Sequence, residues 1–432
     1  MLPQFLIAAP SSGSGKTTIT QGLLRSLRNK GFSVQAFKCG PDYIDTKHHE
    51  WASGNVSINL DTFMSSPEHV TDIYSKYSSK ADATVVEGVM GLFDGANRME
   101  GSSAEIAELL DIPIILVINA KATAYSVAPL LYGYKHFYPK IKIAGAIFNF
   151  VNSESHYQFM KDACEDVGVE ALGYVPRNEN INLPERHLGL QISAEDNYED
   201  TINAMASHLE KTVDIDRLLE ICNSKRPEYK AESIKTKPKL RIGVAKDEAF
   251  NFTYHENLRA LSQIGEISYF SPISDNTLPD VDFIYLAGGY PELYLEELSQ
   301  NISMRRAIQD FATSGGKILA ECGGMMYLSK NIIDKAGKLY PMVGFLDQNA
   351  SMKNMKLKLG YRKIKLEAET LFGHEFHYSH LVDSKEKTKD IEVYSARAKR
   401  LDTQVIRKNN VLASYIHFYW GEKNIYTTFW DK

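Results

Sequence analysis

The feature that most constrains the fold of this chain is a short segment rich in serine and glycine close to its first residues. Residues 11–18 read SSGSGKTT, between an apolar run that ends at Ala9 and an amphipathic stretch from Thr17 to Lys30. A strand, a glycine loop and a helix start together form a phosphate-binding loop, in which backbone N–H groups face phosphate oxygens. We therefore predict a site for ATP and Mg²⁺, with the Thr17 hydroxyl on the metal. Its expected nucleotide-binding residues are Gly13, Ser14, Gly15, Lys16, Thr17 and Thr18.

One position of this loop departs from the usual pattern. A glycine ordinarily lies five residues before Gly15, and here that residue is Pro10. The loop therefore resembles the variant found in dethiobiotin synthetases and MinD proteins. The alternative is a plain serine–glycine turn with a solvated lysine, and the strand–loop–helix context argues against it.

Short apolar runs alternate with helical patterns along the chain, which predicts an α/β fold with a doubly wound, mainly parallel sheet in the first half. A polar, lysine-rich stretch with two prolines follows. We interpret residues 223–238 as a linker between a domain at 1–222 and a domain at 239–432. The predicted strands of the first domain are 5–9, 33–37, 83–87, 114–119 and 143–149. Those of the second are 240–245, 267–270, 283–287 and 317–321, with a β-rich tail at 361–366, 391–394 and 411–415.

Carboxylates follow two of the predicted strands where a nucleotide would bind. Glu87 ends the strand at 83–87, and Asp94 lies in the loop after it. Asp42 and Asp45 follow the strand at 33–37. Because ligands of a parallel sheet bind at the carboxyl ends of its strands, we predict Glu87 and Asp45 as Mg²⁺ ligands. Asp42, Asp45 and Asp94 are expected on the phosphate side of the site, with a role in turns as the alternative.

The second half holds a candidate nucleophile, because the predicted strand at 317–321 runs directly into Cys322-Gly323-Gly324. Small residues after the cysteine permit the sharp strand-to-helix turn that exposes a nucleophile, and the helix N-terminus is expected to lower the pKa of the thiol. Backbone N–H groups of Gly289 and Gly323 are predicted to form an oxyanion hole. A buried, inert cysteine is the alternative, and these glycines argue against it.

His417, at the end of a late strand, is the predicted general base for Cys322. Class I glutamine amidotransferases carry a glutamate two residues beyond this histidine, where the present chain has Tyr419. A Cys–His dyad is therefore the simplest arrangement. A second histidine cluster, GHEFHYS at 373–379, lacks the HExxH spacing of zinc sites. We interpret His374 and His377 as structural or substrate-facing.

Composition argues against several classes of function. The net charge is −5 and the pI is near 6.2, which gives no indication of a basic surface for nucleic acid or for an anionic membrane. The first apolar run lacks the basic region of a signal peptide, and no segment has the length of a transmembrane helix. The four cysteines show no CxxC spacing, which favours a reducing compartment. We expect a cytoplasmic protein without nucleic-acid or membrane partners.

These motifs together resemble those of the cobyrinic acid a,c-diamide synthase family along essentially the whole chain. The matching segments in the first half are SSGSGKTT (11–18), FKCGPDYID (37–45), VVEGVMGLFDG (85–95) and PERHLGL (184–190). Those in the second half are AGGYPEL (287–293), AECGGMMYL (320–328) and GHEFHYS (373–379). The segments at 37–45 and 184–190 are the most specific, because neither belongs to phosphate-loop ATPases or glutaminases in general.

The resemblance implies an ATP- and Mg²⁺-dependent amidation of the a and c acetate side chains of cobyrinate, with glutamine or ammonia as the nitrogen donor. It implies a synthetase in the N-terminal domain and a class I glutamine amidotransferase-like domain at the C-terminus, and the family also lacks the third triad glutamate. A polyanionic substrate makes Lys38, Arg186 and His187 candidate contacts for its carboxylates. Glutamine and a cobyrinate-like tetrapyrrole are the expected partners, and a homodimer is the assembly we consider.

Three alternatives stay open at this point. Cobyric acid synthase shares the architecture but lacks the GPDYID stretch. Synthases that act on Ni-sirohydrochlorin or hydrogenobyrinate share nearly all of the motifs. A MinD/ParA-like switch ATPase would carry a signature lysine where this chain has Pro10 and Ser11, and it would lack a cysteine-elbow domain.

Overall fold

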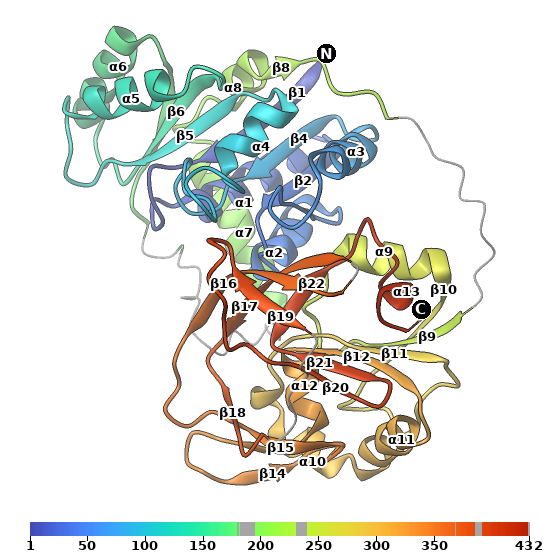
Figure 1. The fold of residues 1–432 in the computed structure, drawn as a ribbon. Coiled ribbons are helices and arrows are strands. Elements are labelled where there is room, and N and C mark those ends of the chain that lie inside the picture. Colours follow the sequence, from blue (N-terminus) through green and yellow to red (C-terminus); the bar gives the residue numbers. More distant parts are fainter. Residues whose placement is uncertain (179–180, 182–194, 230–239, 368, 385–390, 431–432) are drawn as a thin grey trace. The chain divides into compact units, whose positions relative to one another are not determined.

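The computed structural model describes residues 1–178, 181, 195–229, 240–367, 369–384 and 391–430 (Figure 1). The chain divides into two compact units, Met1–Glu232 and Ser233–Lys432. This division falls inside the stretch 223–238 that we predicted as a linker. No helix in the described part of the chain combines the length and the apolar character that a membrane span requires.

The first unit is built on one sheet with the strand order β3-β2-β4-β1-β5-β6-β7, and all neighbours in this order are parallel. The parallel sheet predicted from the sequence is confirmed, and β3 and β7 are additions to it. The strands are β1 (Leu2–Ala8), β2 (Val34–Cys39), β3 (Ile58–Leu60), β4 (Ala83–Glu87), β5 (Ile114–Asn119), β6 (Ile143–Asn149) and β7 (Glu170–Val175).

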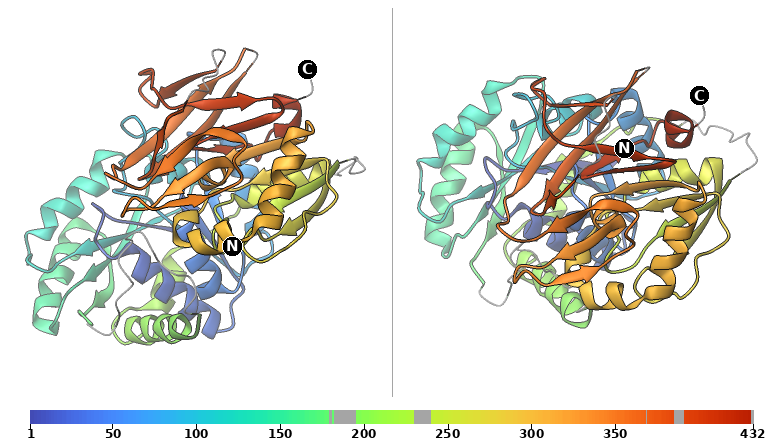
Figure 2. Two further views of the ribbon diagram at one scale, coloured as in Figure 1. Left: turned by 90° about the horizontal axis from the view of Figure 1, so that it is seen from below. Right: turned by 60° about the horizontal axis from the view of Figure 1, so that its bottom comes forward.

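Helices cover both faces of this sheet, because successive side chains of each strand point to opposite faces. On β1, Phe5 and Ile7 join a core with α1, α2, α7 and α8, whereas Leu6 and Ala8 join a core with α3, α4, α5 and α6. Helices α1 and α7 pack against each other (Figures 1 and 2). The helices are α1 (Lys16–Asn29), α2 (Ile44–Ser53), α3 (Pro67–Ser78), α4 (Ser103–Leu110), α5 (Val127–Phe137), α6 (Glu154–Val167), α7 (Glu195–Leu209) and α8 (Ile215–Ile221).

Two residues that the prediction assigned to the linker belong to the first unit. Asn223 and Ser224 form the short strand β8 (Asn223–Ser224), which pairs antiparallel with the start of β1. Gln4 explains this pairing, since its side-chain amide donates to Ser224 Oγ at 2.7 Å and its backbone N–H donates to Cys222 O at 3.1 Å. The strand was not predicted because this stretch is polar and its pairing depends on Gln4, which is distant in the sequence.

The second unit contains a sheet with the order β10-β9-β11-β12-β21-β20, which is parallel except for β20. The four strands predicted for the start of this unit, at 240–245, 267–270, 283–287 and 317–321, are confirmed. The strands are β9 (Leu240–Ala245), β10 (Gly265–Phe270), β11 (Phe283–Leu286), β12 (Lys317–Glu321), β20 (Val405–Lys408) and β21 (Val411–Ser414). Its helices are α9 (His255–Ile264), the 3₁₀ turn η1 (Pro291–Leu293), α10 (Leu295–Gln300), α11 (Ile302–Thr313), α12 (Gly323–Leu328) and α13 (Ile425–Phe429).

Two four-stranded sheets make up the β-rich tail. An antiparallel sheet has the order β19-β16-β17-β22, and a mixed sheet has the order β14-β13-β15-β18. Strand β17 was not predicted, because its buried positions include Gly373, Glu375 and His377 where apolar residues are expected. The strands are β13 (Ser329–Ile333), β14 (Leu339–Pro341), β15 (Leu346–Ser351), β16 (Lys358–Lys365), β17 (Thr370–His377), β18 (His380–Val382), β19 (Glu392–Ser395) and β22 (Ile416–Tyr419).

Candidate functional site

The predicted phosphate loop leaves β1 after Ala8 and ends where α1 begins at Lys16. Gly13 and Gly15 have φ angles of 77° and 93°, in the left-handed region that favours glycine. A Cβ atom on Gly15 would lie 2.0 Å from Asn149 Nδ2, so a larger residue does not fit there. Asn149 Nδ2 also donates to Ser14 O at 3.0 Å. The end of β6 therefore holds the loop in its shape.

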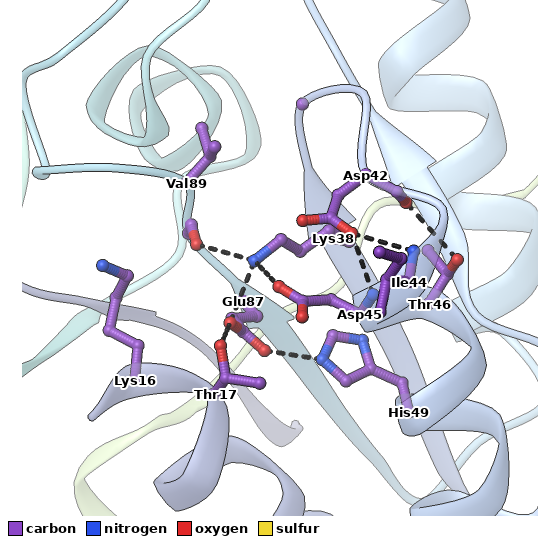
Figure 3. Close-up of polar contacts among 12 residues, drawn as sticks. Lys16, Thr17, Lys38, Asp42, Ile44, Asp45, Thr46, His49, Glu87 and Val89 are labelled. Atoms are coloured by element: carbon purple, nitrogen blue, oxygen red, sulfur yellow. Dashed lines mark hydrogen bonds and ion pairs between the residues drawn. The ribbon is translucent and has the colours of Figure 1, made fainter. Parts of the chain in front are cut away.

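The first residues of α1 face the loop that follows β4 (Figure 3). Lys16 Nζ donates to Met90 O at 2.6 Å, and Thr17 Oγ1 donates to Glu87 Oε1 at 2.7 Å. Glu87 is the last residue of β4, the strand that neighbours β1 in the sheet. The structure thus brings together the hydroxyl group and one of the carboxylates that the sequence analysis assigned to Mg²⁺.

Glu87 lies at the centre of a buried ionic cluster (Figure 3). Lys38 Nζ is 2.9 Å from Glu87 Oε1 and 2.6 Å from Asp45 Oδ2. His49 Nε2 lies 2.6 Å from Glu87 Oε2, and all four side chains are at most 3% exposed. Burial alone would lower the pKa of Lys38, but Asp45 and Glu87 outweigh burial and raise that pKa above its ordinary value. Burial would raise the pKa of Glu87, and Lys38 and His49 reverse this, so that the net shift is downward.

His49 was not predicted from the sequence, although one signal indicated it. His49 lies four residues after Asp45 on α2, and residues at this spacing share one face of a helix. Its other ring nitrogen, Nδ1, lies 3.2 Å from Ser57 Oγ, so both nitrogens of the buried ring have polar neighbours. This histidine therefore orients the Glu87 carboxylate from the side opposite Thr17.

The Thr17 and Glu87 oxygens fit a Mg²⁺ ion that is bound together with a nucleotide. Oxygen atoms are the ligands that Mg²⁺ prefers, and in nucleotide sites most of them come from phosphate and water. Among the residues described by the structure, no group of three or more His, Cys, Asp or Glu side chains could hold a metal ion without such help. Asp45 contacts Lys38 in the same cluster, and its role as a metal ligand stays a prediction.

The remaining predicted residues of the first unit occupy different settings. Asp42 Oδ1 accepts from the N–H groups of Ile44 and Asp45, at the start of α2. Asp94 Oδ2 accepts from the N–H of Gly91, in the loop after β4. Their roles beside the phosphates stay predictions. Arg186 and His187 lie outside the residues that the structure describes.

A cavity of about 880 Å³ opens beside the phosphate loop. Gly15 and Thr18 line one side of it, and the ends of β6 and β7 line the other. Its polar lining includes Asn152 and Arg177. Its volume lies within the range of pockets that bind small molecules and cofactors. The predicted Thr18 thus faces the space that a nucleotide bound to the loop would reach.

In the second unit, Cys322 forms a sharp turn between β12 and α12, with φ 46° and ψ −104°. This conformation is strained for a residue with a side chain. The Cys322 N–H donates to Ser414 O at 2.7 Å, which ties the turn to β21. A Cβ atom on Gly323 would lie 3.2 Å from Gly289 N and 2.8 Å from Pro291 Cδ. The turn predicted for Cys322 is confirmed, and its role as a nucleophile stays a prediction.

His417 borders the same glycine pair from another strand. A Cβ atom on Gly288 would lie 2.1 Å from His417 Cε1, so the imidazole approaches the backbone closely. Gly289, with φ 155°, is the neighbour of Gly323 described above. The structure therefore places His417 beside Gly288 and the glycine after Cys322 beside Gly289, and the catalytic roles of these residues stay predictions. The backbone N–H groups of the two predicted oxyanion-hole glycines lie in adjacent segments.

Burial controls the protonation of the cysteine and the histidine. It raises the pKa of the Cys322 thiol above its ordinary value, and nearby Glu292 raises it further. It lowers the pKa of His417 well below its ordinary value, with His374 adding to this effect. The expectation that a helix N-terminus lowers the thiol pKa is therefore wrong for the net effect. The Gly323 N–H acts in that direction, but burial outweighs it. The resting pair is a thiol and a neutral imidazole.

Glu321, next to Cys322, was also missed from the sequence. Its carboxyl group accepts from Tyr285 Oη at 2.7 Å and from the N–H of Phe418 at 3.0 Å. Burial raises the pKa of Glu321 to about 8. Because Phe418 follows His417, this buried acid joins the strand that precedes the cysteine to the strand that carries the histidine.

The GHEFHYS segment has the contacts of a structural cluster. His377 Nε2 lies 2.9 Å from Glu375 Oε1, and His377 Nδ1 lies 2.8 Å from Ser379 O. Its ring stacks on Tyr415 with centroids 3.7 Å apart. Both nitrogens of His377 are thus engaged by the protein, which favours the structural interpretation over zinc.

Comparisons with known proteins agree with both halves of this description. Residues 5–190 match the model of the CobQ/CobB/MinD/ParA nucleotide binding domain, and residues 241–425 match that of the CobB/CobQ-like glutamine amidotransferase domain. The cobyrinate a,c-diamide synthase of Leptospira interrogans is 40% identical, over 97% of this chain and 96% of that protein. The enzymes of the same name from Caldanaerobacter subterraneus and Picrophilus torridus are 37% and 39% identical, over 98% and 96% of this chain and 95% of each relative.

Proposed function

This chain belongs to the cobyrinate a,c-diamide synthase family of ATP-dependent, glutamine-using ligases, and from that membership we propose that it converts the a and c acetate carboxylates of cobyrinate into carboxamides. The observation that supports the proposal is the presence of two candidate sites in one chain. One is the phosphate loop with the Thr17–Glu87 pair, and the other is the Cys322 turn beside His417. The first site suits the activation of a carboxylate, and the second suits the release of ammonia from glutamine.

The synthetase step begins with a carboxylate, which is a poor acyl donor. A substrate carboxylate oxygen attacks the γ-phosphorus of ATP, ADP leaves, and an acyl phosphate forms. Lys16 and the backbone N–H groups of the loop orient the phosphates and offset their charge. Bound Mg²⁺, on Thr17 and Glu87, would supply further charge neutralisation. Ammonia then attacks the acyl carbon and loses a proton, and phosphate leaves with the electron pair of the C–O bond.

Lys38 supports this step from a buried position. Its contacts with Glu87 and Asp45 fix the direction of both carboxylates, and His49 holds the second oxygen of Glu87. The Lys38 charge also helps to hold the pKa of Glu87 below its ordinary value. An ionised Glu87 is the form that can bind Mg²⁺. We propose Lys38 chiefly as the organiser of this cluster. Arg186 and His187 are the candidates for contact with the substrate carboxylates, and an unchanged KM of an Arg186→Ala variant would remove Arg186 from that role.

The glutaminase step starts from a neutral thiol and a neutral imidazole. The Cys322 sulfur attacks the amide carbon of glutamine as its proton passes to His417, so that no separated ion pair is buried beforehand. The N–H groups of Gly289 and Gly323 stabilise the oxyanion. His417 returns the proton to the leaving nitrogen, and ammonia departs. Water then hydrolyses the thioester and releases glutamate.

The test is an assay of the purified full chain with ATP, Mg²⁺, glutamine and cobyrinate, followed by the mass of the products. We expect stepwise replacement of two carboxyl OH groups by NH₂ in the wild type. Cys322→Ala should carry out this conversion with ammonia but not with glutamine. Unchanged cobyrinate together with glutamine hydrolysis would overturn the substrate and direct the search to Ni-sirohydrochlorin or hydrogenobyrinate. No amidation with any nitrogen source would overturn the whole proposal.

A further inference from the structure

Class I glutamine amidotransferases carry a glutamate two residues beyond the catalytic histidine, where this chain has Tyr419. In the proposed glutaminase the GHEFHYS segment stacks a ring, that of His374, against His417. We propose that His374, held by Tyr254, is the positioning residue that fixes the imidazole of His417 for proton transfer from Cys322. This inference rests on the proposed glutaminase function. It assigns a role in the second unit to a histidine that the proposed mechanism does not use.

The two histidines face each other across paired strands. His374 on β17 and His417 on β22 are directly opposite partners in the antiparallel register, so their side chains lie on the same face of the sheet. Their rings stack with centroids 4.9 Å apart and an interplanar angle of 16°. Both side chains are buried, at 4% and 1% exposure. The His374 ring therefore covers one face of the His417 ring.

A second constraint on the His417 ring comes from the backbone at Gly288. Gly288 approaches the Cε1 edge of the ring so closely that a Cβ atom there would lie 2.1 Å away. The His417 ring is thus contacted at one face by His374 and at one edge by Gly288, and both contacts restrict its rotation about the side-chain bonds. Packing thus does for this imidazole what a hydrogen-bonded carboxylate does in a triad, where the acid keeps the base in the orientation that meets the nucleophile.

Tyr254 fixes His374 in turn. Tyr254 Oη lies 2.8 Å from His374 Nδ1, and the tyrosine side chain is itself buried. Tyr254 also packs edge-on against Tyr419, with centroids 5.3 Å apart. Tyr419 is the residue at the position of the missing glutamate. Tyr254 therefore contacts both His374 and the residue at the position of the glutamate.

The protonation of His374 suits a positioning role. Burial, with a smaller effect from Arg362, lowers the pKa of His374 to about 3. The ring is consequently neutral and does not compete with His417 for the thiol proton. Because the His374 ring is neutral, two positively charged rings do not stack against each other when His417 becomes protonated.

Glu375 carries the nearest carboxylate on the same strand, and this carboxylate binds other side chains. Its Oε2 accepts from Arg362 Nε at 2.5 Å and from Thr403 Oγ1 at 2.8 Å, and its Oε1 lies 2.9 Å from His377 Nε2. Because neighbouring residues of a strand point to opposite faces, Glu375 and His374 face different surroundings. The charge of this carboxylate raises the pKa of His417 against the stronger effect of burial.

Four variants of the full chain test this assignment: His374→Ala, His374→Phe, Tyr254→Phe and, as a matched control, Tyr394→Phe. The control makes the same change as Tyr254→Phe on β19 of the same sheet, where the Tyr394 hydroxyl donates to Glu392. We expect His374→Ala to lower kcat for glutamine hydrolysis about a hundredfold with little change in KM, because a misplaced base costs rate and not binding. His374→Phe should restore part of the loss, and Tyr254→Phe should lower kcat about tenfold.

The alkylation rate of Cys322 by iodoacetamide is the second readout, because it reports proton removal from the thiol without the need for glutamine. The alkylation rate should rank the variants in the same order as kcat does. Tyr394→Phe should match the wild type in both measurements. A His374→Ala rate within about twofold of wild type in both readouts would overturn the inference. So would a His374→Phe variant as slow as His374→Ala, because a ring nitrogen and not the stack would then matter.

Further measurements distinguish a failure of this inference from misfolding of a variant and from a failure of the proposed function. Ammonia-dependent amidation and thermal unfolding report whether each variant is folded. If His374→Ala does not fold, the Tyr254→Phe and Tyr394→Phe pair decides, since each loses a single oxygen atom. If the wild type fails to hydrolyse glutamine, the proposed function falls, while the alkylation series still shows whether His374 positions the base beside Cys322.

Discussion

The candidate ATP site of the first unit and the candidate glutaminase site of the second are held together by different forces. In the first, Lys38, Asp45, Glu87 and His49 form a buried cluster of charged and polar groups that contact one another directly. In the second, Cys322 and His417 are neutral and are confined by strained backbone, closely packed glycines and a stacked ring. Ionised oxygens are needed where a metal and phosphates bind, whereas a proton exchange between thiol and imidazole needs mainly alignment.

This contrast predicts that each site fails in its own way. Loss of a group in the first unit should leave buried charge without compensation, and the cost should appear in folding. Loss of a group in the second should leave the fold intact, and the cost should appear in rate.

Cys322→Ala should lower glutamine-dependent amidation by a factor of about a thousand or more, because no other group can form the thioester. Ammonia-dependent amidation should persist, since free ammonia bypasses this step. Product formation with each nitrogen source measures both. Cys164→Ala, which removes a thiol buried in α6, is the matched control and should retain glutamine use. Equal losses with both nitrogen sources would show that the two sites do not divide the work in this way.

Lys38→Met should lower the free energy of unfolding of the first unit by about 3–5 kcal/mol, because removal of one partner leaves buried carboxylates uncompensated. Chemical denaturation with a probe in the first unit measures this value. Lys140→Met is the matched control, since Lys140 pairs with Glu108 at the surface and is 66% exposed. It should leave stability nearly unchanged. Similar losses for the two variants would contradict a cluster held by buried charge.

Glu321 provides a pH test of the second unit. Its pKa is raised by burial to about 8 in the folded chain, from an ordinary value of 4.5. Between these values the folded state binds a proton that the unfolded state has lost, so stability falls as the pH rises, by up to about 1.4 kcal/mol per pH unit. Glu321→Gln should flatten this decline, as measured by denaturation at several pH values. Glu369→Gln, at a partly exposed ion pair with Lys423, should not.

Asn149→Ala tests whether the phosphate loop depends on a neutral contact as well as on charge. The side chain donates to Ser14 O and accepts from the N–H of Phe150. Loss of such a buried hydrogen bond costs about 1–3 kcal/mol, so the KM for ATP should rise about tenfold. The preference for ATP over GTP should not change, because the amide holds the loop and does not read the base. A relaxed preference would instead make Asn149 a base-recognition residue.

The sequence was sufficient for features that depend on local spacing. The strand, the glycines at 13 and 15 and the start of α1 are consecutive, and so are β12, Cys322 and α12. Local pattern therefore predicted both turns and the parallel sheets. It also placed Glu87 beside Thr17, because the carboxyl ends of neighbouring parallel strands meet at one edge.

Contacts between distant segments could not be predicted in the same way. Tyr254 meets His374 across 120 residues of sequence, and Asn149 reaches Ser14 across 135. Neither residue type has a spacing rule that indicates such a partner. The pKa of Cys322 was predicted in the wrong direction because the helix terminus is visible in the sequence, whereas the extent of burial emerges only from the fold.

Strand β8 gives the first unit a natural end. It returns to the start of β1, so the sheet is complete at Ser224, before the second unit begins. A gene fragment ending at residue 190, where the nucleotide-binding family model stops, would omit α7 and the core residues Ile202 and Leu209. A fragment ending after Ser224 would cut no strand of this sheet. A gene fusion or fission at this point would leave each sheet whole, and one placed after Arg226 would also keep the hydrogen bonds of Arg226 to Ser78 O and Ala81 O.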